Sequence, residues 1–451
     1  MESRRVRSKA SPPPRRAGLR GRAGLPSSLE EDEPVGLPLL PHHIILEILT
    51  FLDARAIVRT RGVSRGLRAD APALIDKLEF HEGQKFPSFK TTKEYSGLKE
   101  VRLEGDNRLL CDAAAGLRGA SSLHHLTICR PRSLVEKTPL SETTTEKLCA
   151  LPLREFDMRR VEIVFPAGLL MPAWQTLEKL VIRDGLLDDT SIINLIGSIS
   201  EAISTGDLPL RHLDLSRNLF GRDHAMRPLA EALRSFPEME TLELTANRVS
   251  SDGAKLVMRE LLDGTCPRLR TLELSLNFLH NDALDSLANG IGLAGHGLQN
   301  LRMLGIGGRF SPDETVTSFE SIARAIAMGG LPLLDYLHLQ GDVGPTQVGP
   351  LLLEFRHGGC PNLAVVKLER AVLFHPAEDA DSTEDAVISM LELVNSSWVP
   401  RLREVHVLGM NLGKGMEFAK EDRTAFYRAG SETSFHRLAK AGAKRGVMIF
   451  V

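Results

Sequence analysis

The sequence predicts an α/β solenoid, in which a short strand and a helix alternate along a stack of similar units. The main observation is a phrase, L-x-x-L-x-L-x-x-N, that occurs at Leu210–Asn218, Met239–Asn247 (with Met in the first place) and Leu269–Asn277. The copies start 29 and 30 residues apart. A fixed period of this kind is the signature of a repeat architecture.

Each repeat supplies the pattern of one strand and one helix. The inner leucines, such as Leu213 and Leu215, alternate with polar residues, as a short half-buried strand requires. The asparagine falls where the chain leaves the strand, so that its amide can bond the backbone of neighbouring turns. Between the phrases, leucines recur at helical spacing, as in Ala254–Leu262. Such a unit cannot bury its apolar face alone, and neighbouring units are therefore expected to stack.

These phrases and helices resemble the leucine-rich-repeat family, in its long, ribonuclease-inhibitor-like subclass. The resemblance implies parallel strands on the concave side and helices on the convex side. Weaker copies without the asparagine raise the expected number of strands to about eleven, and they begin at Leu98, Leu123, Leu153, Leu177, Leu301, Leu334, Leu363 and Leu402. Val447–Val451 is expected to form a last strand after a helix from about Arg423 to Lys444, closing the open end of the sheet.

The ends and one interior segment differ in composition from the repeats. Residues 1–36 carry eight Arg and Lys side chains before an acidic cluster, and we expect a disordered basic tail. A nuclear signal and an organelle transit peptide both remain open for this tail. Acidic residues in the wide gap between Leu363 and Leu402 predict an acidic insert, a solvated loop, near residues 375–388.

Residues 37–80 predict a small helical domain ahead of the repeats at 81–451. Pro41 can open a helix, because the N–H that it lacks has no partner in the first turn. A wide apolar face then extends from Ile44 to Leu52. The segment is too small to bury this surface by itself, so it must pack on the solenoid, on another chain, or on both.

This segment resembles an F-box in Leu40-Pro41, in the helix that ends at Asp53, and in Val63-Ser64-Arg65. It departs from the family at Ala54, where proline is usual, and at Leu67, where tryptophan is usual. The alternative is a helical cap that shields the first repeat. The resemblance implies binding to a Skp-type adaptor, and through it to a cullin–RING ubiquitin ligase, by Leu40, Pro41, Ile44, Ile45, Ile48, Leu49, Leu52 and Val63.

Composition narrows the function classes. A net charge of −2 gives no global field for nucleic acid or anionic membrane, and no apolar run is long enough to span a bilayer. Five cysteines without a C-x-x-C pair favour a reduced intracellular compartment, cytoplasmic and/or nuclear. We expect no catalytic residues, cofactor or metal, because no catalytic or metal-binding motif is present. The cluster Gly305-Ile306-Gly307-Gly308 is expected inside a repeat turn.

The combined expectation is an adaptor that holds a target protein for ubiquitination and performs no chemistry itself. The alternatives are a leucine-rich-repeat interaction scaffold and a regulator of a small GTPase, neither with a ubiquitin role. Asp214, Glu243 and Glu273 occupy one position in successive repeats and predict attraction of a basic partner. The expected substrate-binding residues alternate with the strand leucines: His212, Asp214, Ser216, Thr241, Glu243, Thr245, Thr271, Glu273, Ser275, Tyr336, His338 and Gln340.

Overall fold

One parallel sheet of thirteen strands, in sequence order from β1 to β13, runs through the described part of this computed structural model. The structure describes residues 77–81, 97–117, 120–131, 139–166, 172–203, 208–294, 297–308, 318–343, 345–371, 380–408 and 432–450. The strands are β1 Lys77–Phe80, β2 Glu100–Glu104, β3 His125–Cys129, β4 Glu155–Arg159, β5 Lys179–Arg183, β6 His212–Asp214, β7 Thr241–Glu243, β8 Thr271–Glu273, β9 Met303–Gly307, β10 Tyr336–Val343, β11 Val365–Ala371, β12 Glu404–Leu408 and β13 Met448–Phe450.

The described helices lie on one side of the sheet. They are α4 Asn107–Gly116, α5 Glu142–Cys149, α6 Asp189–Ile203, α7 Asp223–Ala232, α8 Ser251–Leu262, α9 Asn281–Ala294, α10 Glu320–Ala325, α11 Pro345–Glu354, α12 Ala380–Asn395 and α14 Glu432–Arg445. Between β4 and β5, the helical part of the connection is a short 3₁₀ helix, Pro172–Gln175, whose buried Trp174 donates a hydrogen bond to Ser198 Oγ at 2.9 Å. Local sequence sets helix starts: the side chains of Asp106, Ser141 and Ser250 cap α4, α5 and α8.

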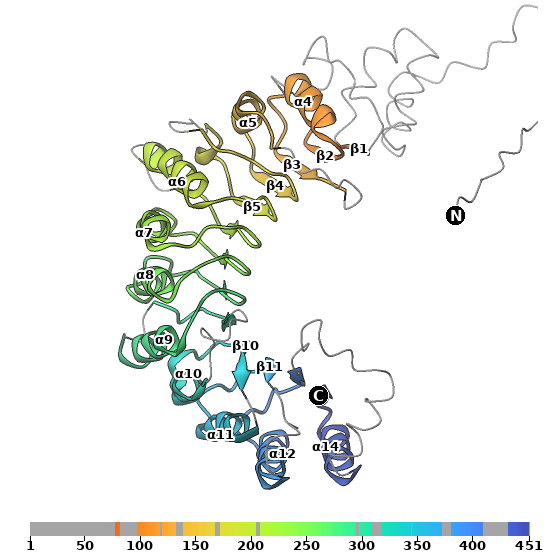
Figure 1. The fold of residues 1–451 in the computed structure, drawn as a ribbon, viewed down its shortest axis with the longest axis vertical. Helices are drawn as coiled ribbons and strands as arrows, with labels where there is room; N and C mark the ends of the chain where they lie inside the picture. Colours follow the sequence, from red (N-terminus) through yellow and green to blue (C-terminus); the bar gives the residue numbers. More distant parts are fainter. Residues whose placement is uncertain are drawn as a thin grey trace, which may run out of the picture.

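The stack bends into an arc with the strands inside and the helices outside (Figure 1). Neighbouring strands of a sheet lie about 4.8 Å apart, whereas packed helices need about 8–10 Å. Units that are thicker on the helix side must fan out, and the strand side becomes concave. The predicted solenoid, with strands on its concave side and helices on its convex side, is confirmed.

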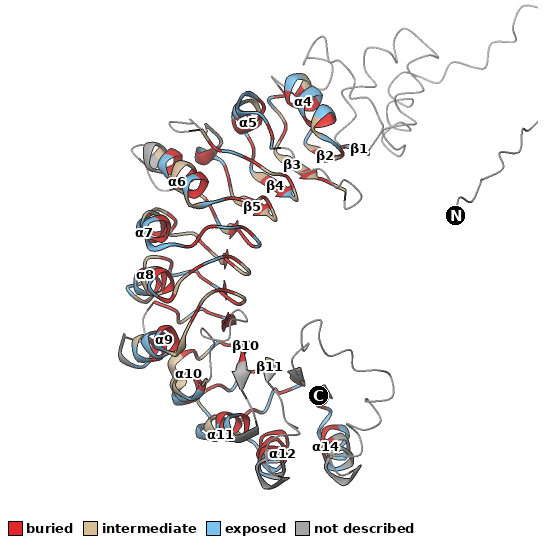
Figure 2. Ribbon diagram, in the orientation of Figure 1, coloured by how far each residue is buried: buried red, intermediate tan, exposed pale blue. Residues whose placement is uncertain are grey.

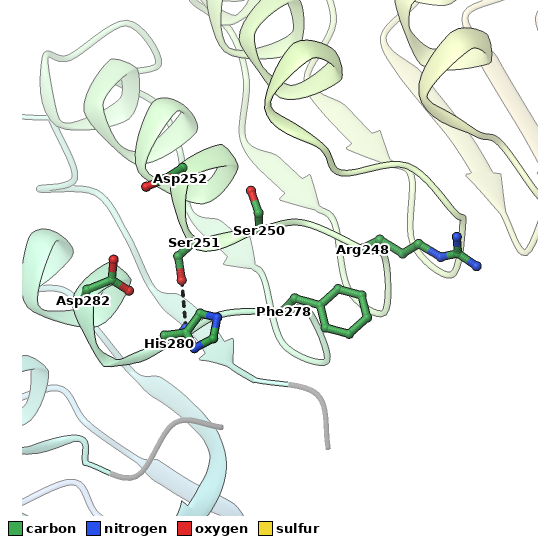
Figure 3. Close-up of a pocket in the computed structure, with 7 residues that line it drawn as sticks. All are labelled: Arg248, Ser250, Ser251, Asp252, Phe278, His280 and Asp282. Atoms are coloured by element: carbon green, nitrogen blue, oxygen red, sulfur yellow. Dashed lines mark hydrogen bonds between the residues drawn. The ribbon is translucent and has the colours of Figure 1, made fainter. Parts of the chain in front are cut away.

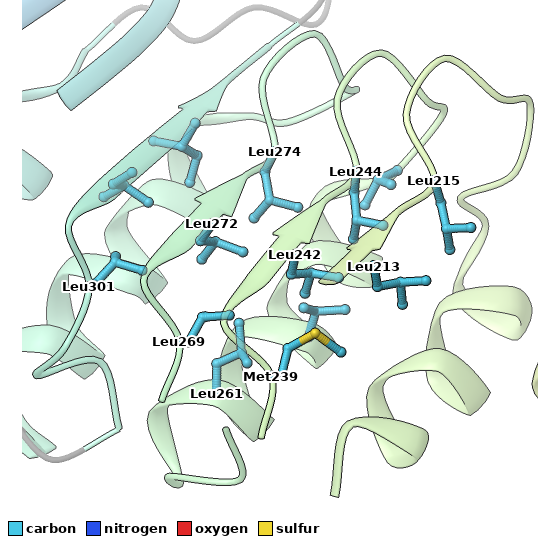
Figure 4. Close-up of a cluster of buried hydrophobic side chains, with 14 of the residues drawn as sticks. Leu213, Leu215, Met239, Leu242, Leu244, Leu261, Leu269, Leu272, Leu274 and Leu301 are labelled. Carbon is cyan, nitrogen blue, oxygen red and sulfur yellow. The ribbon is translucent and has the colours of Figure 1, made fainter. Parts of the chain in front are cut away.

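The core is a continuous layer between sheet and helices, which Figure 2 shows as buried residues along the whole arc. In register, Leu213 pairs with Leu242 and Leu242 with Leu272, and each of the three is at most 1% exposed. Leu215, Leu244 and Leu274 form the next layer of the same cluster (Figure 4). Burying a leucine side chain contributes about 1.5–3 kcal/mol, and here each one is buried against its neighbours' leucines.

The three asparagines of the phrase form a ladder at the turns beyond the strand ends. Asn247 Nδ2 donates to the carbonyl oxygens of Leu215 (3.1 Å) and Leu244 (2.8 Å). Its Oδ1 accepts the backbone N–H of Asn218 at 2.7 Å, and Asn277 Oδ1 accepts that of Asn247 at 3.0 Å. All three side chains are at most 3% exposed. The residue before each asparagine has a positive φ of 57–61°. These bonds therefore hold a left-handed turn that its non-glycine residue does not favour.

Several boundaries differ from the expectations. Lys77–Phe80, expected within the preceding domain, forms β1 and pairs with β2, because its residues Leu78 and Phe80 alternate with polar ones and Leu78 is buried. The last strand is confirmed as β13, paired with β12. The helix before it begins at Glu432, and residues 423–431 lie outside the described part of the chain. The predicted basic tail and residues 37–76, which include all eight expected adaptor-binding residues, also lie outside the described part of the chain.

The acidic segment near residues 375–388 is not a loop from Ala380 onward, where α12 begins. Apolar residues follow the acidic ones at helical spacing, and Ala386, Val387 and Met390 are fully buried. The segment supplies the helix of its repeat, between α11 and α14. The glycine cluster was also placed wrongly, because Gly305 and Gly307 lie inside β9. They alternate there with the buried Leu304 and Ile306, as strand residues do.

Asn247→Ala should destabilise the whole array, because it leaves the Asn218 N–H and two carbonyl oxygens buried without this partner. Each unsatisfied group costs about 1–3 kcal/mol, so we expect a loss of about 2–5 kcal/mol in urea unfolding. The control is Asn300→Ala, which removes one exposed hydrogen bond to the Pro267 carbonyl oxygen and should cost less than about 1 kcal/mol. Equal losses from the two variants would contradict a stabilising ladder.

Candidate interaction site on the concave face

Three rows of side chains cross the concave face, because the strands pair in register. Across β6, β7 and β8 the rows are His212–Thr241–Thr271, Asp214–Glu243–Glu273 and, just beyond the strand ends, Ser216–Thr245–Ser275. After β9, they continue to Tyr336, His338 and Gln340 on β10. The structure therefore brings the twelve expected substrate-binding residues together on one face.

None of the twelve is fully exposed. Five are buried, namely Asp214, Ser216, Glu273, Ser275 and Gln340, and the other seven are partly exposed. A freely solvated row would expose them, so neighbouring side chains must cover them. The concave face is a bonded network with restricted access.

Arg183, at the end of β5, neutralises part of the negative charge of the row Asp214–Glu243–Glu273. Its Nη2 lies 2.6 Å from Asp214 Oδ2 and 2.7 Å from Glu243 Oε2, so one guanidinium reaches across β6 to β7. Asp214 Oδ1 also accepts the Ser216 N–H at 2.9 Å. The pKa of Glu243 is nevertheless raised, mainly by burial and by the charge of Asp214. The positive charge of Arg183 lowers this pKa but does not cancel the two larger effects. The repulsion expected along the row is thus only partly offset within the chain.

Side-chain donor atoms of His212, Asp214 and Glu243 lie within 4.8 Å of one another, a spacing that a metal ion could use. The guanidinium of Arg183 already contacts both carboxylates. Burial, together with the nearby positive charge of Lys179, lowers the pKa of His212. A metal ion would have to displace Arg183, so this cluster is explained by its internal cation.

A second network begins at Glu273 and passes over β9. A Cβ at position 305 would overlap the Glu273 carboxylate, so glycine leaves the space through which Glu273 reaches His338 at 3.6 Å. His338 Nε2 lies 3.0 Å from Glu369 Oε2, which Lys367 Nζ contacts at 2.9 Å. A Cβ at position 307 would meet the backbone carbonyl and Cβ of Gln340, so glycine is required there as well, and Gln340 Oε1 accepts the Leu276 N–H at 3.0 Å.

These contacts shift the pKa values on β10 and β11. Burial alone would lower the pKa of His338, but the ion pair with Glu273 and the hydrogen bond to Glu369 raise it above its ordinary value. The hydrogen bond from His338, with help from Lys367, lowers the pKa of Glu369 to about 2. Folding therefore favours protonation of His338 relative to the unfolded chain.

Beyond β8, the first row changes from polar to apolar. Met303, Tyr336 and Val365 are neighbours in register on β9, β10 and β11, and all are partly exposed. At the end of the sheet, Met448 and Phe450 are 53% and 41% exposed. Tyrosine and methionine are enriched at protein interfaces, where they provide contact area. We call Met303, Tyr336 and Val365 the apolar row.

A separate hollow of about 460 Å³ lies on the loops that lead into α8 and α9 (Figure 3). It is lined by Arg248, Ser250, Ser251, Asp252, Phe278, His280 and Asp282. Lys255 contacts both Asp252 and Asp282, and Ser251 Oγ accepts the His280 N–H at 2.9 Å. These polar groups serve the packing of two helix starts, and they define no ligand chemistry.

Sequence reasoning missed Arg183, Met303, Val365, Lys367 and Glu369. All five sit on strands whose copy of the phrase lacks the asparagine, so the complete phrase does not mark them. Aligning every copy on its leucines would have placed them in the same rows.

Comparison with known proteins bears on the segment before the sheet. The model of the F-box domain family matches residues 37–69, which confirms the resemblance noted from Leu40-Pro41 to Val63-Ser64-Arg65. No curated protein matches the chain. Among solved structures, the crystal structure of the Rad7 and Elc1 complex in yeast is similar at 16% identity and a TM-score of 0.37, covering 64% of this chain and 68% of that one.

No helix among the described residues is long and apolar enough to cross a membrane.

The His338 contacts predict a specific pH dependence. Because its pKa is raised on folding, protonated His338 stabilises the fold below its unfolded pKa of about 6.5, and this contribution is lost as pH rises through the folded pKa. Between about pH 5.5 and 8.5, the wild type should lose more unfolding free energy than His338→Gln does. His280→Gln, which removes a histidine without an ion pair among the described residues, should keep the wild-type slope in urea titrations. Parallel curves for wild type and His338→Gln would contradict the assignment.

Proposed function

We propose that the chain is the substrate-recognition adaptor of a Skp–cullin–F-box type ubiquitin ligase. The observation that carries the proposal is the F-box domain match at residues 37–69. The solenoid supports it, because its first described strand starts at Lys77, soon after the F-box segment, and its sheet presents one long concave face. One part would attach to the ligase, and the other would hold the target.

In this proposal the chain binds a Skp-type adaptor, which connects it to a cullin, through the apolar residues of the F-box segment: Leu40, Pro41, Ile44, Ile45, Ile48, Leu49, Leu52 and Val63. The concave face of the leucine-rich repeats holds the target protein, and the chain performs no chemistry itself. It would act in the cytoplasm, the nucleus or both, without binding nucleic acid or membrane. An apolar face of this kind concentrates its binding energy in a few anchoring side chains.

The test replaces three of these anchors by aspartate, in the combined variant Leu40→Asp, Ile44→Asp, Leu52→Asp. Co-purification of the Skp-type adaptor and the cullin from cells should fall to background, because each buried anchor typically contributes about 2 kcal/mol or more. Circular dichroism should show an unchanged repeat domain.

The matched control places three aspartates at exposed apolar positions of the solenoid, Leu219, Met328 and Ile388. It should recover as much adaptor as the wild type. If the wild-type chain recovers neither adaptor nor cullin, the ubiquitin role fails, and a repeat scaffold or a small-GTPase regulator takes its place.

A further inference from the structure

A histidine lies between two carboxylates on the concave face. His338 Nδ1 is 3.6 Å from Glu273 Oε2 on β8, and its Nε2 is 3.0 Å from Glu369 Oε2 on β11. Lys367 Nζ is 2.9 Å from the same oxygen of Glu369. With His338 protonated, two cations face two carboxylates, and the cluster is neutral. Loss of this one proton leaves the cluster with a net negative charge.

The other titratable groups near the cluster have partners of their own or stay neutral. Those on β7, β10 and β12 are Glu243, Tyr336, Glu404 and His406, and β9 has no titratable side chain. Glu243 is bonded to Arg183, and the two residues of β12 are bonded to each other at 2.9 Å. Burial raises the pKa of Tyr336, which stays neutral. Among the described residues, His338 is therefore the only cation in contact with Glu273.

A neutral imidazole can serve only one of the two carboxylates. It has one N–H and one lone pair, so one of its nitrogens must turn a lone pair toward a negative charge. The Nε2 side of His338 has the shorter contact, and its partner Glu369 is also bonded to Lys367. On the other side, Ser275 Oγ is 3.4 Å from Nδ1 and can donate to the lone pair there. The remaining proton therefore stays on Nε2, and Glu273 is the carboxylate that loses its cation.

Glu273 is too buried to stay in place without that cation. It is 8% exposed, and a buried charge without a partner is costly. Burial alone would raise the pKa of Glu273, but the contacts with His338 and Ser275 lower it. Glu243 occupies the same register position on β7, so a move in that direction meets a like charge. The direction left to the carboxylate is outward, from the sheet into solvent.

Gly305 shows that the Glu273 carboxylate is a movable cover over β9. The three heavy atoms nearest to a Cβ at position 305 all belong to this carboxyl group, at 2.0–2.2 Å. They are the far end of a flexible side chain, which can rotate away, whereas backbone atoms could not. Met303 of the apolar row lies on the same strand, two residues before Gly305. An outward turn of Glu273 would therefore uncover the backbone of β9 beside the apolar row.

We propose that Glu273, Gly305 and His338 form a proton-controlled latch on the concave face. While His338 is protonated, Glu273 lies across Gly305 and links β8 to β10. When His338 loses its proton, Glu273 turns toward solvent and uncovers β9. The inference goes beyond the proposed function, because the latch would act on any partner that binds this face.

Hydrogen exchange at Ser275 reports the position of Glu273. The Ser275 N–H donates to Glu273 Oε1 at 3.0 Å, so it loses its acceptor when the latch opens. Ser216 is a matched reference in the same molecule, because its N–H donates at 2.9 Å to Asp214, at the equivalent position of β6. The cation beside Asp214 is Arg183, and arginine stays charged throughout the range of the experiment. The ratio of the two exchange rates therefore removes the intrinsic effect of pH on exchange.

The experiment follows both amides of the full-length chain by residue-resolved mass spectrometry between about pH 6 and 9. As pH rises, exchange at Ser275 should accelerate about 10- to 100-fold relative to Ser216, the range for losing a hydrogen bond to a charged acceptor. The midpoint should coincide with the titration of His338, followed by NMR of 13C-labelled histidine and assigned by the signal that His338→Gln removes. A constant ratio, or a midpoint that does not follow His338, would overturn the inference.

Gly305→Ala should open the latch without changing either charged residue. Its Cβ would displace the Glu273 carboxylate, so Ser275 should already exchange fast relative to Ser216 at about pH 6, and the titration midpoint of His338 should fall. The control, Gly292→Ala, adds a methyl group where no atom lies within 4 Å and should leave both readings unchanged. A Gly305→Ala chain with the wild-type ratio would overturn the latch. If this variant unfolds, the pH dependence of the wild-type ratio decides alone.

Adaptor recovery separates this inference from the proposed function. Gly305→Ala should co-purify as much Skp-type adaptor as the wild type, because the F-box segment precedes the sheet. A constant exchange ratio overturns the latch and leaves the adaptor role intact. A pH-dependent ratio in a chain that recovers no adaptor overturns only the ubiquitin role.

Discussion

Each repeat completes the burial of its strand leucines against the leucines of the neighbouring repeats, and the rest of the structure depends on this constraint. Leu213, Leu242 and Leu272 lie in one register layer and are almost completely buried. A slip of one residue would turn these leucines outward and carry charged side chains into the core. Register is therefore fixed at every strand, and it determines the curvature, the asparagine ladder and the concave rows.

Fixed register also decides how charge is distributed. It places Asp214, Glu243 and Glu273 side by side, which would be costly on adjacent strands without compensation. Arg183 supplies part of that compensation from β5, and His338 supplies another part from β10 through the space over Gly305. The two networks separate between β7 and β8, where Glu243 pairs toward β5 and Glu273 toward β10. A face that is preorganised by such contacts favours selective binding, since little ordering is lost on association.

The sequence was most informative where the phrase is complete. Alternating leucines and a terminal asparagine correctly predicted β6, β7 and β8, and the asparagines bond neighbouring turns as expected. It was less informative where polar composition hides a helix. The acidic start of α12 resembled a loop, because its large apolar residues begin only at Val387, after Asp385.

The sequence predicted where the residues of the candidate site lie, but not the ion pairs and hydrogen bonds that they form. Facing residues can be assigned from strand alternation, so all twelve appear in the expected rows. Arg183 and Gly305 could not be assigned roles, because these depend on how far a side chain reaches across strands that are distant in the sequence. Whether a row is solvated or bonded is decided by such long-range contacts, which no local pattern contains.

Hydrogen exchange on the Leu244→Ala variant tests the stacked array most directly. This leucine is fully buried in the middle of the stack, and its truncation typically costs about 2–5 kcal/mol. If each repeat is stable only through its neighbours, amide protection should fall from about Leu213 to Leu274, across three strands. A loss of protection confined to the immediate surroundings of residue 244 would contradict the account.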